Sequence, residues 1–288
     1  MTSELERLFE HLRFPSISTD SRHVADVRAN AEWLVGQFEG MGMATEIHET
    51  PGNPIVIARN EHVGGRRTVL IYGHYDVQPV DPLELWDSAP FEPEIRDGKI
   101  WGRGGADNKG QHFVHMLGAE KTIRENGELP VNVIFLIEGE EEIGSPNLVP
   151  FLEEHKDELA CDIIAVSDTG MVAPGVPTLG YGLRGITCLE VMVKGPTGDL
   201  HSGVYGGAVA NPATAASRMV ASLHEGDGKI AVEGFYDDVI PLEDWEREMW
   251  AKVPGASDED FLETTGSPES FGEPGYSIAE RLWGRPTV

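Results

Sequence analysis

Hydrophobic positions in the first half of the chain follow two spacings, one helical and one strand-like. Leu5, Leu8, Phe9 and Leu12 recur at the i, i+3, i+4 and i+7 spacing of an amphipathic helix. Further along, the pattern predicts a helix from about 24 to 38, strands near 45–48, 54–59 and 68–72, a helix from about 107 to 127, a strand at 131–137, a helix from about 146 to 159 and a strand at 163–167. This alternation predicts an α/β domain, with a mostly parallel sheet flanked by helices.

The hydrophobic pattern changes after Tyr181-Gly182. Ile186–Val193 alternates like a longer strand, and a helix is predicted from Asn211 to about His224, with Pro212 in its first turn. We therefore predict two domains, residues 1–182 and residues 183–288, of which the second is an α+β domain.

Composition narrows the classes of partner. The chain has 288 residues, of which 40% are hydrophobic, which is enough for a substantial core. Its 22 Lys and Arg residues stand against 49 Asp and Glu, a net charge of −27 that argues against nucleic acid and anionic membranes as partners. Cys161 and Cys188 match no Cys-x-x-Cys pattern, so we expect reduced thiols and a cytoplasmic protein.

Acidic residues and a histidine follow the predicted strands. His74 and Asp76 come after the strand near 68–72, three glutamates come after 131–137, and Asp168 comes after 163–167. Open α/β sheets bind ligands at the carboxyl ends of their strands, so these side chains are expected to converge. A histidine with several carboxylates and no cysteine is typical of a hydrolytic metal centre.

His74 and Asp76 are two residues apart on an extended segment, so their side chains point the same way. A histidine that binds a metal needs a partner for its other ring nitrogen. Asp76 is either that partner or a ligand itself, and a purely structural role for the pair stays open.

Asp107 lies at the predicted start of a helix, where aspartate is a preferred N-cap residue. The glycines at 102, 104 and 105 suggest more than a cap, because they let the backbone pass close to a bound group. They do not form a P-loop, since the Gly-Lys-[Ser/Thr] ending is absent.

Three adjacent carboxylates, Glu140, Glu141 and Glu142, repel one another and are costly near a sheet end unless cations neutralise them. An acidic surface turn is the alternative. His201 lies in a glycine-rich segment of the second domain, where a structural role is also open. The histidines predicted to be surface residues are His11, His23, His48, His62, His155 and His224.

Five segments in order carry a family resemblance: GHYDVQP, GRGGADNKG, EGEEEIGS, SDT and GPTGDLHSGVYGG. Together they resemble the M20 family of metallopeptidases, and most of all its carnosinase-like dipeptidase branch. The resemblance implies a catalytic domain with two divalent metal ions, most often zinc and otherwise manganese or cobalt. It also implies an inserted lid domain through which the protein forms a homodimer, and small peptides as substrates.

The resemblance implies a metal ligand set as well. By analogy with the family, His74 and Asp168 bind one metal ion, Glu142 binds the other, and Asp107 bridges the two. Three of these four residues follow predicted strands, and the fourth, Asp107, lies in the glycine-rich segment.

Catalytic roles follow from the same resemblance. Glu141 corresponds to the general base, which takes a proton from a metal-bridging water that attacks the amide carbonyl and then protonates the leaving amine. Asp76 orients His74. His201 corresponds to a lid histidine that crosses the dimer interface to stabilise the oxyanion.

The chain departs from the family pattern in one respect. The family's second metal ion is also bound by a histidine late in the catalytic domain, and a lid arginine helps to hold the substrate carboxylate. Neither is found here, so we expect a C-terminally truncated chain. Two alternatives remain beside a dipeptidase. One is an N-acyl amino acid deacylase, since the family uses one site for both chemistries. The other is an inactive fragment that only dimerises or binds one metal ion, which the expected truncation motivates.

Overall fold

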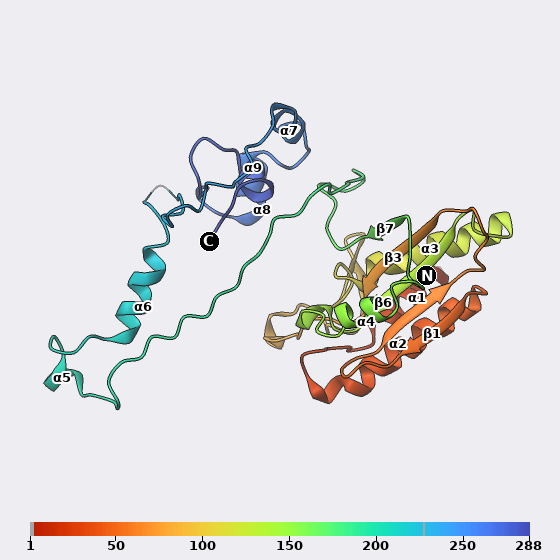
Figure 1. Cartoon of the computed structure of the whole chain (residues 1–288), viewed down its shortest axis with the longest axis horizontal. Helices are drawn as coiled ribbons and strands as arrows, with labels where there is room; N and C mark the ends of the chain where they lie inside the picture. The colour runs from red at the N-terminus through yellow and green to blue at the C-terminus, as the bar shows by residue number, and fades with distance from the viewer. Residues whose placement is uncertain (1–2, 227) are drawn as a thin grey trace. The chain divides into compact units, whose positions relative to one another are not determined.

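The computed structural model describes residues 3–226 and 228–288, which divide into two compact units, Met1–Gly170 and Met171–Val288 (Figure 1). The first unit contains α1 (Ser3–Leu12), α2 (Val24–Gly40), β1 (Ala44–His48), β2 (Ile55–Arg59), β3 (Thr68–His74), β4 (Glu94–Arg96), β5 (Lys99–Trp101), α3 (Lys109–Asn126), β6 (Asn132–Glu138), α4 (Leu148–Glu154) and β7 (Ile163–Val166). Short 3-10 turns lie at Ser21–His23, Leu83–Leu85 and Glu141–Ile143. The assignment of the two units as a catalytic and a lid domain stays a prediction, and the division falls 12 residues before the predicted boundary at 182.

Five strands of the first unit form one sheet in the order β1-β2-β6-β3-β7. β3 runs parallel to both β6 and β7, whereas the pairs β1–β2 and β2–β6 are antiparallel. The α/β class predicted from the sequence is confirmed, with a sheet that is mixed. The parallel register places Tyr72 beside Leu136 and Val166, so the carboxyl ends of all three strands meet at one edge of the sheet.

The sheet has a core on each face, because alternate residues of its central strands point in opposite directions. Val56 of β2 and Phe135 of β6 belong to the larger core, which includes apolar residues of α2 and α3. Ile57 and Leu136, one position along each strand, belong to a second core with Phe151 of α4. Every residue of β6 is buried, which is typical of a strand covered on both faces.

Glycine ends the long helix α3. Gly127 has a φ of 82°, in the left-handed region that favours glycine, and its N–H donates to the Ile123 carbonyl at 2.7 Å. Sequence analysis placed the helix at about 107–127, in agreement with the observed bounds. The two-stranded hairpin β4–β5, which follows the Pro-rich loop after β3, was missed because each strand has only three residues.

The second unit is helical in its described residues, with α5 (Ser202–Tyr205), α6 (Pro212–Ala221), α7 (Asp244–Trp250), α8 (Asp258–Thr265) and α9 (Ile278–Trp283). The predicted helix at Asn211 is present. Asn211 is its N-cap, and its side chain accepts the Ala213 N–H at 2.9 Å. Across the described residues, no helix has both the length and the apolar character needed to cross a membrane.

The strand predicted at Ile186–Val193 is wrong for this structure. These residues have no regular secondary structure, and Leu189 at the centre of the segment is 87% exposed. A strand is stabilised by hydrogen bonds and side-chain contacts with neighbouring strands, and none of the described strands pairs with this segment. Alternating hydrophobicity alone therefore does not form a strand here.

Candidate metal centre

The predicted site residues of the first unit come together at the carboxyl edge of the sheet. His74 is the last residue of β3, and Asp168 lies two residues beyond β7. Glu141 and Glu142 form the 3-10 turn that follows β6, and Asp107 lies two residues before α3. The parallel pairing of β3 with β6 and β7 is what brings these separate segments to one place.

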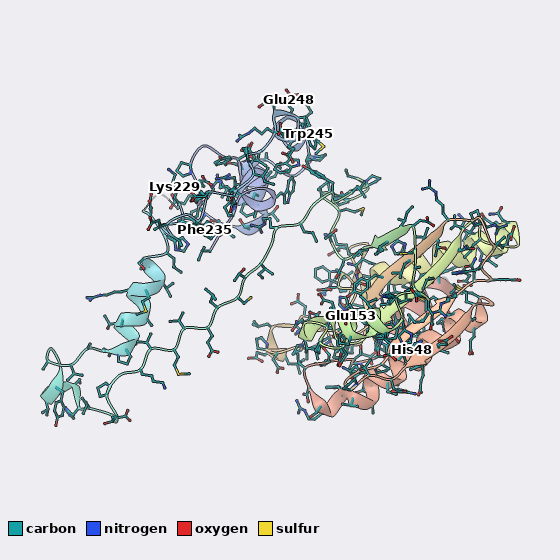
Figure 2. All side chains as sticks on the ribbon, viewed as in Figure 1. His48, Glu153, Lys229, Phe235, Trp245 and Glu248 are labelled. Atoms are coloured by element: carbon teal, nitrogen blue, oxygen red, sulfur yellow. The ribbon has the colours of Figure 1, made fainter. Side chains whose placement is uncertain are left out.

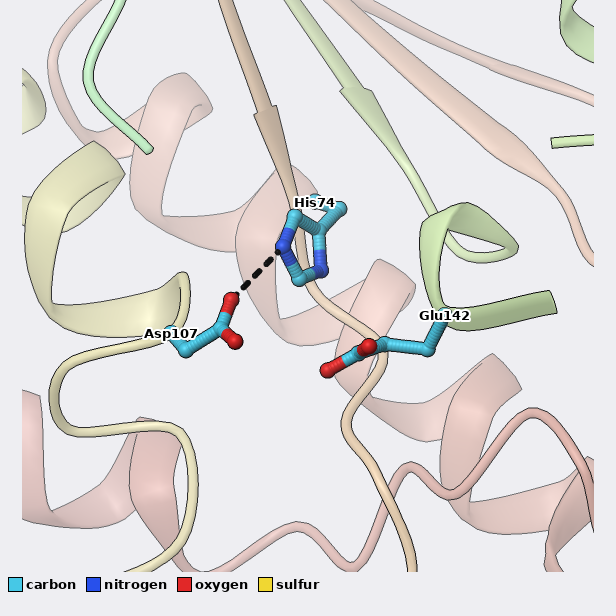
Figure 3. A group of neighbouring side chains, drawn as sticks. All are labelled: His74, Asp107 and Glu142. Carbon is cyan, nitrogen blue, oxygen red and sulfur yellow. Dashed lines mark hydrogen bonds and ion pairs between the residues drawn. The ribbon is translucent and has the colours of Figure 1, made fainter. Parts of the chain in front are cut away.

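His74, Asp107 and Glu142 form a group whose donor atoms all lie within 4.8 Å of one another (Figure 3). The His74 Nε2 atom is 3.1 Å from Asp107 Oδ1 and 3.7 Å from Asp168 Oδ1. One imidazole nitrogen and several carboxylate oxygens at this spacing match the ligands that Zn²⁺ accepts, and they also suit Mn²⁺ or Co²⁺. The residues present therefore fit a divalent cation.

Asp107 does not cap α3. Asn108 occupies the N-cap position and makes no side-chain cap hydrogen bond there. The Asp107 side chain is mostly exposed, and one of its carboxylate oxygens faces the His74 ring. Of the two roles that the sequence left open for Asp107, the geometry therefore supports a ligand rather than a cap.

Asp76 connects His74 to the acidic turn. Its carboxylate is fully buried and accepts the backbone N–H of Glu141 at 3.2 Å and that of Glu142 at 3.1 Å. On the side of the ring away from Asp107, His74 Nδ1 lies 3.1 Å from the backbone carbonyl of Asp76 and 3.4 Å from its Oδ1 atom. This geometry supports Asp76 as the partner of the second ring nitrogen rather than as a ligand.

The site concentrates negative charge around a single imidazole. Burial works to lower the pKa of His74, but its hydrogen bond to Asp76 and the negative charges of Asp76, Asp168 and Glu141 raise it to about 9. Burial raises the pKa of both Glu141 and Glu142, and neighbouring carboxylates add to that rise. Among the described residues, no Lys or Arg forms an ion pair with the carboxylates of this cluster, which are Asp76, Asp107, Glu141, Glu142 and Asp168. A bound cation would supply the missing positive charge.

Glu140 turns away from the cluster. It is buried, and its two carboxylate oxygens accept the Asn53 N–H at 2.8 Å and the Asn147 side-chain amide at 2.7 Å. The run of three glutamates thus divides into one structural residue, Glu140, and two that face the site.

Two amide side chains in the cluster were not identified from the sequence. Asn108 donates to Asp168 Oδ1 at 2.9 Å, and Gln78 donates to Glu142 Oε2 at 2.7 Å. Both lie inside segments that carry the family resemblance, Gln78 in GHYDVQP and Asn108 in GRGGADNKG. They were not singled out because an amide is neither a usual zinc ligand nor a general base. The role of Asn108 and Gln78 becomes visible only in the folded chain, where each side chain contacts a carboxylate that is distant in the sequence.

A second network behind the site also corrects the sequence analysis. His11 was predicted to be at the surface, but it is fully buried, with Nδ1 2.8 Å from Asn30 Oδ1 and Nε2 2.9 Å from His112 Nε2. The His11 ring also stacks on Trp33 of α2, at 4.8 Å between centroids. Its position on the inner face of α1 was not recognised because histidine was counted as polar.

His201 belongs to the second unit. Its side chain accepts the Gly203 N–H at 3.0 Å, as the N-cap of the short helix α5, and is otherwise exposed. The structural role weighed for this residue is therefore observed, and its proposed part in catalysis stays a prediction.

Comparison with known sequences identifies several relatives. The sequence model of Peptidase family M20/M25/M40 matches residues 70–287. The Cys-Gly metallodipeptidase DUG1 of Candida albicans is 32% identical over 301 residues, which cover 99% of this chain and 62% of that protein. The human Beta-Ala-His dipeptidase is 37% identical over 196 residues, or 67% of this chain and 38% of that protein.

Solved structures with a similar fold include peptidases of the same kind as these relatives. The M20 family metallo-carboxypeptidase Sso-CP2 from Sulfolobus solfataricus has a TM-score of 0.83 and 34% identity, covering 100% of this chain and 64% of that one. The dipeptidase Dug1p from Saccharomyces cerevisiae has a TM-score of 0.80 at 28% identity, covering 99% of this chain and 62% of that one. The chain thus spans less than two thirds of the length of the relatives that match nearly all of it.

Proposed function

Because the chain belongs to Peptidase family M20/M25/M40, we propose that it acts in the metal-dependent hydrolysis of the amide bond of dipeptides or short peptides. The observation that carries this proposal is the group formed by His74, Asp107 and Glu142 at the carboxyl edge of the sheet. Relatives named as Cys-Gly and Beta-Ala-His dipeptidases support the substrate class.

We assign the ligands as the geometry allows. His74 and Asp168 would hold one divalent ion and Glu142 a second, with Asp107 between them, since Asp107 is within 3.1 Å of His74 and in the same group as Glu142. Zinc suits these ligands best, with manganese or cobalt as alternatives. When bound, such ions lower the pKa of water and polarise the substrate carbonyl.

Glu141 is assigned as the general base. Its Oε2 atom lies 3.9 Å from His74 Nε2, so its carboxylate faces the cluster without being needed as a ligand. Burial and nearby negative charges raise its pKa, which brings the carboxylate closer to the pKa that suits proton transfer near neutral pH. In this role Glu141 accepts a proton from the attacking water at a carboxylate oxygen and returns it to the leaving amine nitrogen.

The second unit would serve assembly. We propose that it mediates a homodimer, in which His201 stabilises the oxyanion in the active site of the other copy. Its exposed apolar residues around Leu189 support an interface with another chain. The thiols of Cys161 and Cys188 are free, which supports a reducing, cytoplasmic location. Light scattering of the purified chain tests the dimer.

The proposed chemistry is tested by Glu141→Gln, which keeps the size of the side chain but removes its ability to accept a proton. With Zn²⁺ or Mn²⁺ present, hydrolysis of Cys-Gly and β-Ala-His should fall by about 10³-fold while metal content is unchanged. The matched control is Glu153→Gln, the same change at an exposed position of α4 (Figure 2). Equal activity of Glu141→Gln and wild type would refute the assigned base, and wild type that prefers N-acyl amino acids would favour deacylation.

A further inference from the structure

We propose that Asn108 is a positioning residue of the metal centre, whose carboxamide fixes the carboxylate of Asp168 and the end of β3 that carries His74. This inference rests on the proposed metal site. It assigns a role to a neutral side chain that neither binds the cation nor takes part in proton transfer.

The contacts of Asn108 connect three segments. Its Nδ2 atom donates to the Ser167 carbonyl at 2.7 Å and to Asp168 Oδ1 at 2.9 Å, and its Oδ1 atom accepts the His74 backbone N–H at 3.2 Å. The side chain is 1% exposed. Both donor hydrogens of the amide are therefore used on the Asp168 segment, and its acceptor is used on the His74 segment.

A neutral donor is the chemistry that this position needs. A lysine or arginine beside Asp168 would neutralise the carboxylate and compete with a cation, and a second ionised carboxylate would repel it. The amide N–H of Asn108 orients Asp168 while leaving the second carboxylate oxygen and the remaining lone pairs free for a metal ion. A hydrogen bond from an outer residue to a ligating carboxylate is the arrangement by which metal sites set ligand orientation.

The amide itself is held firmly. Its Oδ1 atom is 3.4 Å from His112 Nδ1, and His112 is linked through His11 to Asn30 by contacts of 2.9 and 2.8 Å. Residue 73 must be glycine for this packing, because a Cβ atom there would lie 2.9 Å from Asn108 Oδ1 and 2.8 Å from His112 Cβ. Helices α1, α2 and α3 thus support the amide from behind.

Gln78 offers a natural comparison. It donates to Glu142 Oε2 at 2.7 Å, so it makes the same kind of contact with another candidate ligand. Gln78 is exposed, and both of its side-chain hydrogen bonds found among the described residues go to Glu142, so water can replace them. We expect the loss of Gln78 to weaken metal binding less than the loss of Asn108.

The test measures Zn²⁺ affinity of the full chain by competition with a chromophoric chelator. Asn108→Ala should weaken Zn²⁺ binding about 10- to 100-fold, the range typical of outer contacts to metal ligands. The matched control is Asn132→Ala. Asn132 is also a buried asparagine of the sheet, but it lies at the start of β6, at the edge opposite the metal centre. Its side chain hydrogen-bonds the backbone of Val63 there. Its loss should lower the melting temperature while changing Zn²⁺ affinity by less than about threefold.

A double-mutant comparison shows whether Asn108 acts through Asp168. In an Asp168→Ala background, Asn108→Ala should weaken Zn²⁺ binding further, but by a smaller factor than in the wild type, because only its hydrogen bond to the His74 backbone is then left to lose. If Asn108→Ala does not fold by circular dichroism, Asn108→Ser takes its place in every comparison.

The outcomes separate this inference from the proposed function. If the wild type and Asn108→Ala bind Zn²⁺ equally well, only the positioning role of Asn108 is overturned, and the metal site stands. The same holds if Asn132→Ala loses as much affinity, since the effect would then be general destabilisation. Wild type that binds no Zn²⁺ overturns both the metal site and the positioning role.

Discussion

β6 in the first unit and Ile186–Val193 in the second are similar runs of mostly apolar residues, and they have opposite fates. Every residue of β6 is buried, and the strand pairs with β2 on one side and β3 on the other. Ile186–Val193 pairs with none of the described strands, and Leu189 is 87% exposed. The difference lies in the neighbours, because strand pairing and cover on both faces turn an apolar run into a buried strand.

The same contrast applies to the two candidate functional histidines. His74 is fully buried at the end of a central strand, and its ring lies between Asp76 and Asp107. His201 caps a helix of four residues, α5, in the second unit. A packed sheet edge can hold a side chain in one orientation, which is what a metal ligand requires.

The largest difference is expected when each of the two histidines is replaced by alanine. His74→Ala should weaken Zn²⁺ binding by more than about 100-fold, because it removes a ligand where outer contacts alone are worth about 10- to 100-fold. His201→Ala should leave Zn²⁺ affinity unchanged. Chelator competition on both variants gives the answer, and a loss of affinity in His201→Ala would show that the second unit contributes to the metal site.

Truncating one apolar residue in each unit should differ nearly as much. Phe135→Ala removes a fully buried ring from β6 and is expected to cost about 3–5 kcal/mol in the free energy of unfolding. Leu189→Ala, at a position exposed in the single chain, is expected to change that free energy by less than about 0.5 kcal/mol at protein concentrations low enough to keep the chain monomeric. Urea unfolding curves of both variants measure this. A large loss in Leu189→Ala would mean that this segment is covered in solution, for example in a dimer.

Acid should act on the first unit through its buried histidines. Burial lowers the pKa of His112 to about 3, and the charges of His74 and Lys109 add to the effect. Burial also lowers the pKa of His11 well below its usual value, with the charge of His112 adding to it. The unfolded chain, whose histidines have an ordinary pKa near 6.5, then binds more protons than the folded one. The stability that His11 and His112 contribute is therefore present above about pH 6.5 and is lost as the pH falls toward 3, by about 2 kcal/mol from His112 between pH 6.5 and 5.

Hydrogen exchange followed by mass spectrometry can assign this loss to one unit. Peptides from α1, α3 and the sheet should exchange faster as the pH falls, after correction for the intrinsic pH dependence of exchange. A His112→Asn variant, although less stable at pH 7, should lose less stability over the same interval. If both proteins respond equally to acid, the buried histidine pair is not the cause.

The sequence predicted the fold wherever apolar periodicity coincided with packing. The two core helices and the strands of the sheet were found near their predicted positions, and α3 ends at Asn126, close to the predicted end at about 127. The hairpin β4–β5 was missed because three-residue strands carry no periodic signal. Ile186–Val193 was predicted as a strand because its own pattern could not show whether other strands would pair with it.

Prediction of the site depended on where the carboxyl ends of the strands meet. The placement of His74, Asp107 and Glu142 in one group followed from that rule, combined with the family resemblance. The positions of Asn108 and Gln78 did not follow, because what an amide contributes depends on contacts made across the fold. The burial of His11 could not be predicted either, because it depends on the packing of α1 against α3.

The smallest expected effect tests whether the second unit has stability of its own. Ser277 is the N-cap of α9, where its hydroxyl accepts the Glu280 N–H at 3.2 Å and the Glu280 carboxylate accepts the Ser277 N–H at 2.8 Å. Ser277→Ala removes half of this capping box and should cost about 1 kcal/mol. Hydrogen exchange should accelerate in α8 and α9, which pack together, and stay unchanged in β3 and β6. Acceleration in both units would mean that they unfold together. The two units would then differ in how much of their apolar surface is buried, but not in their stability.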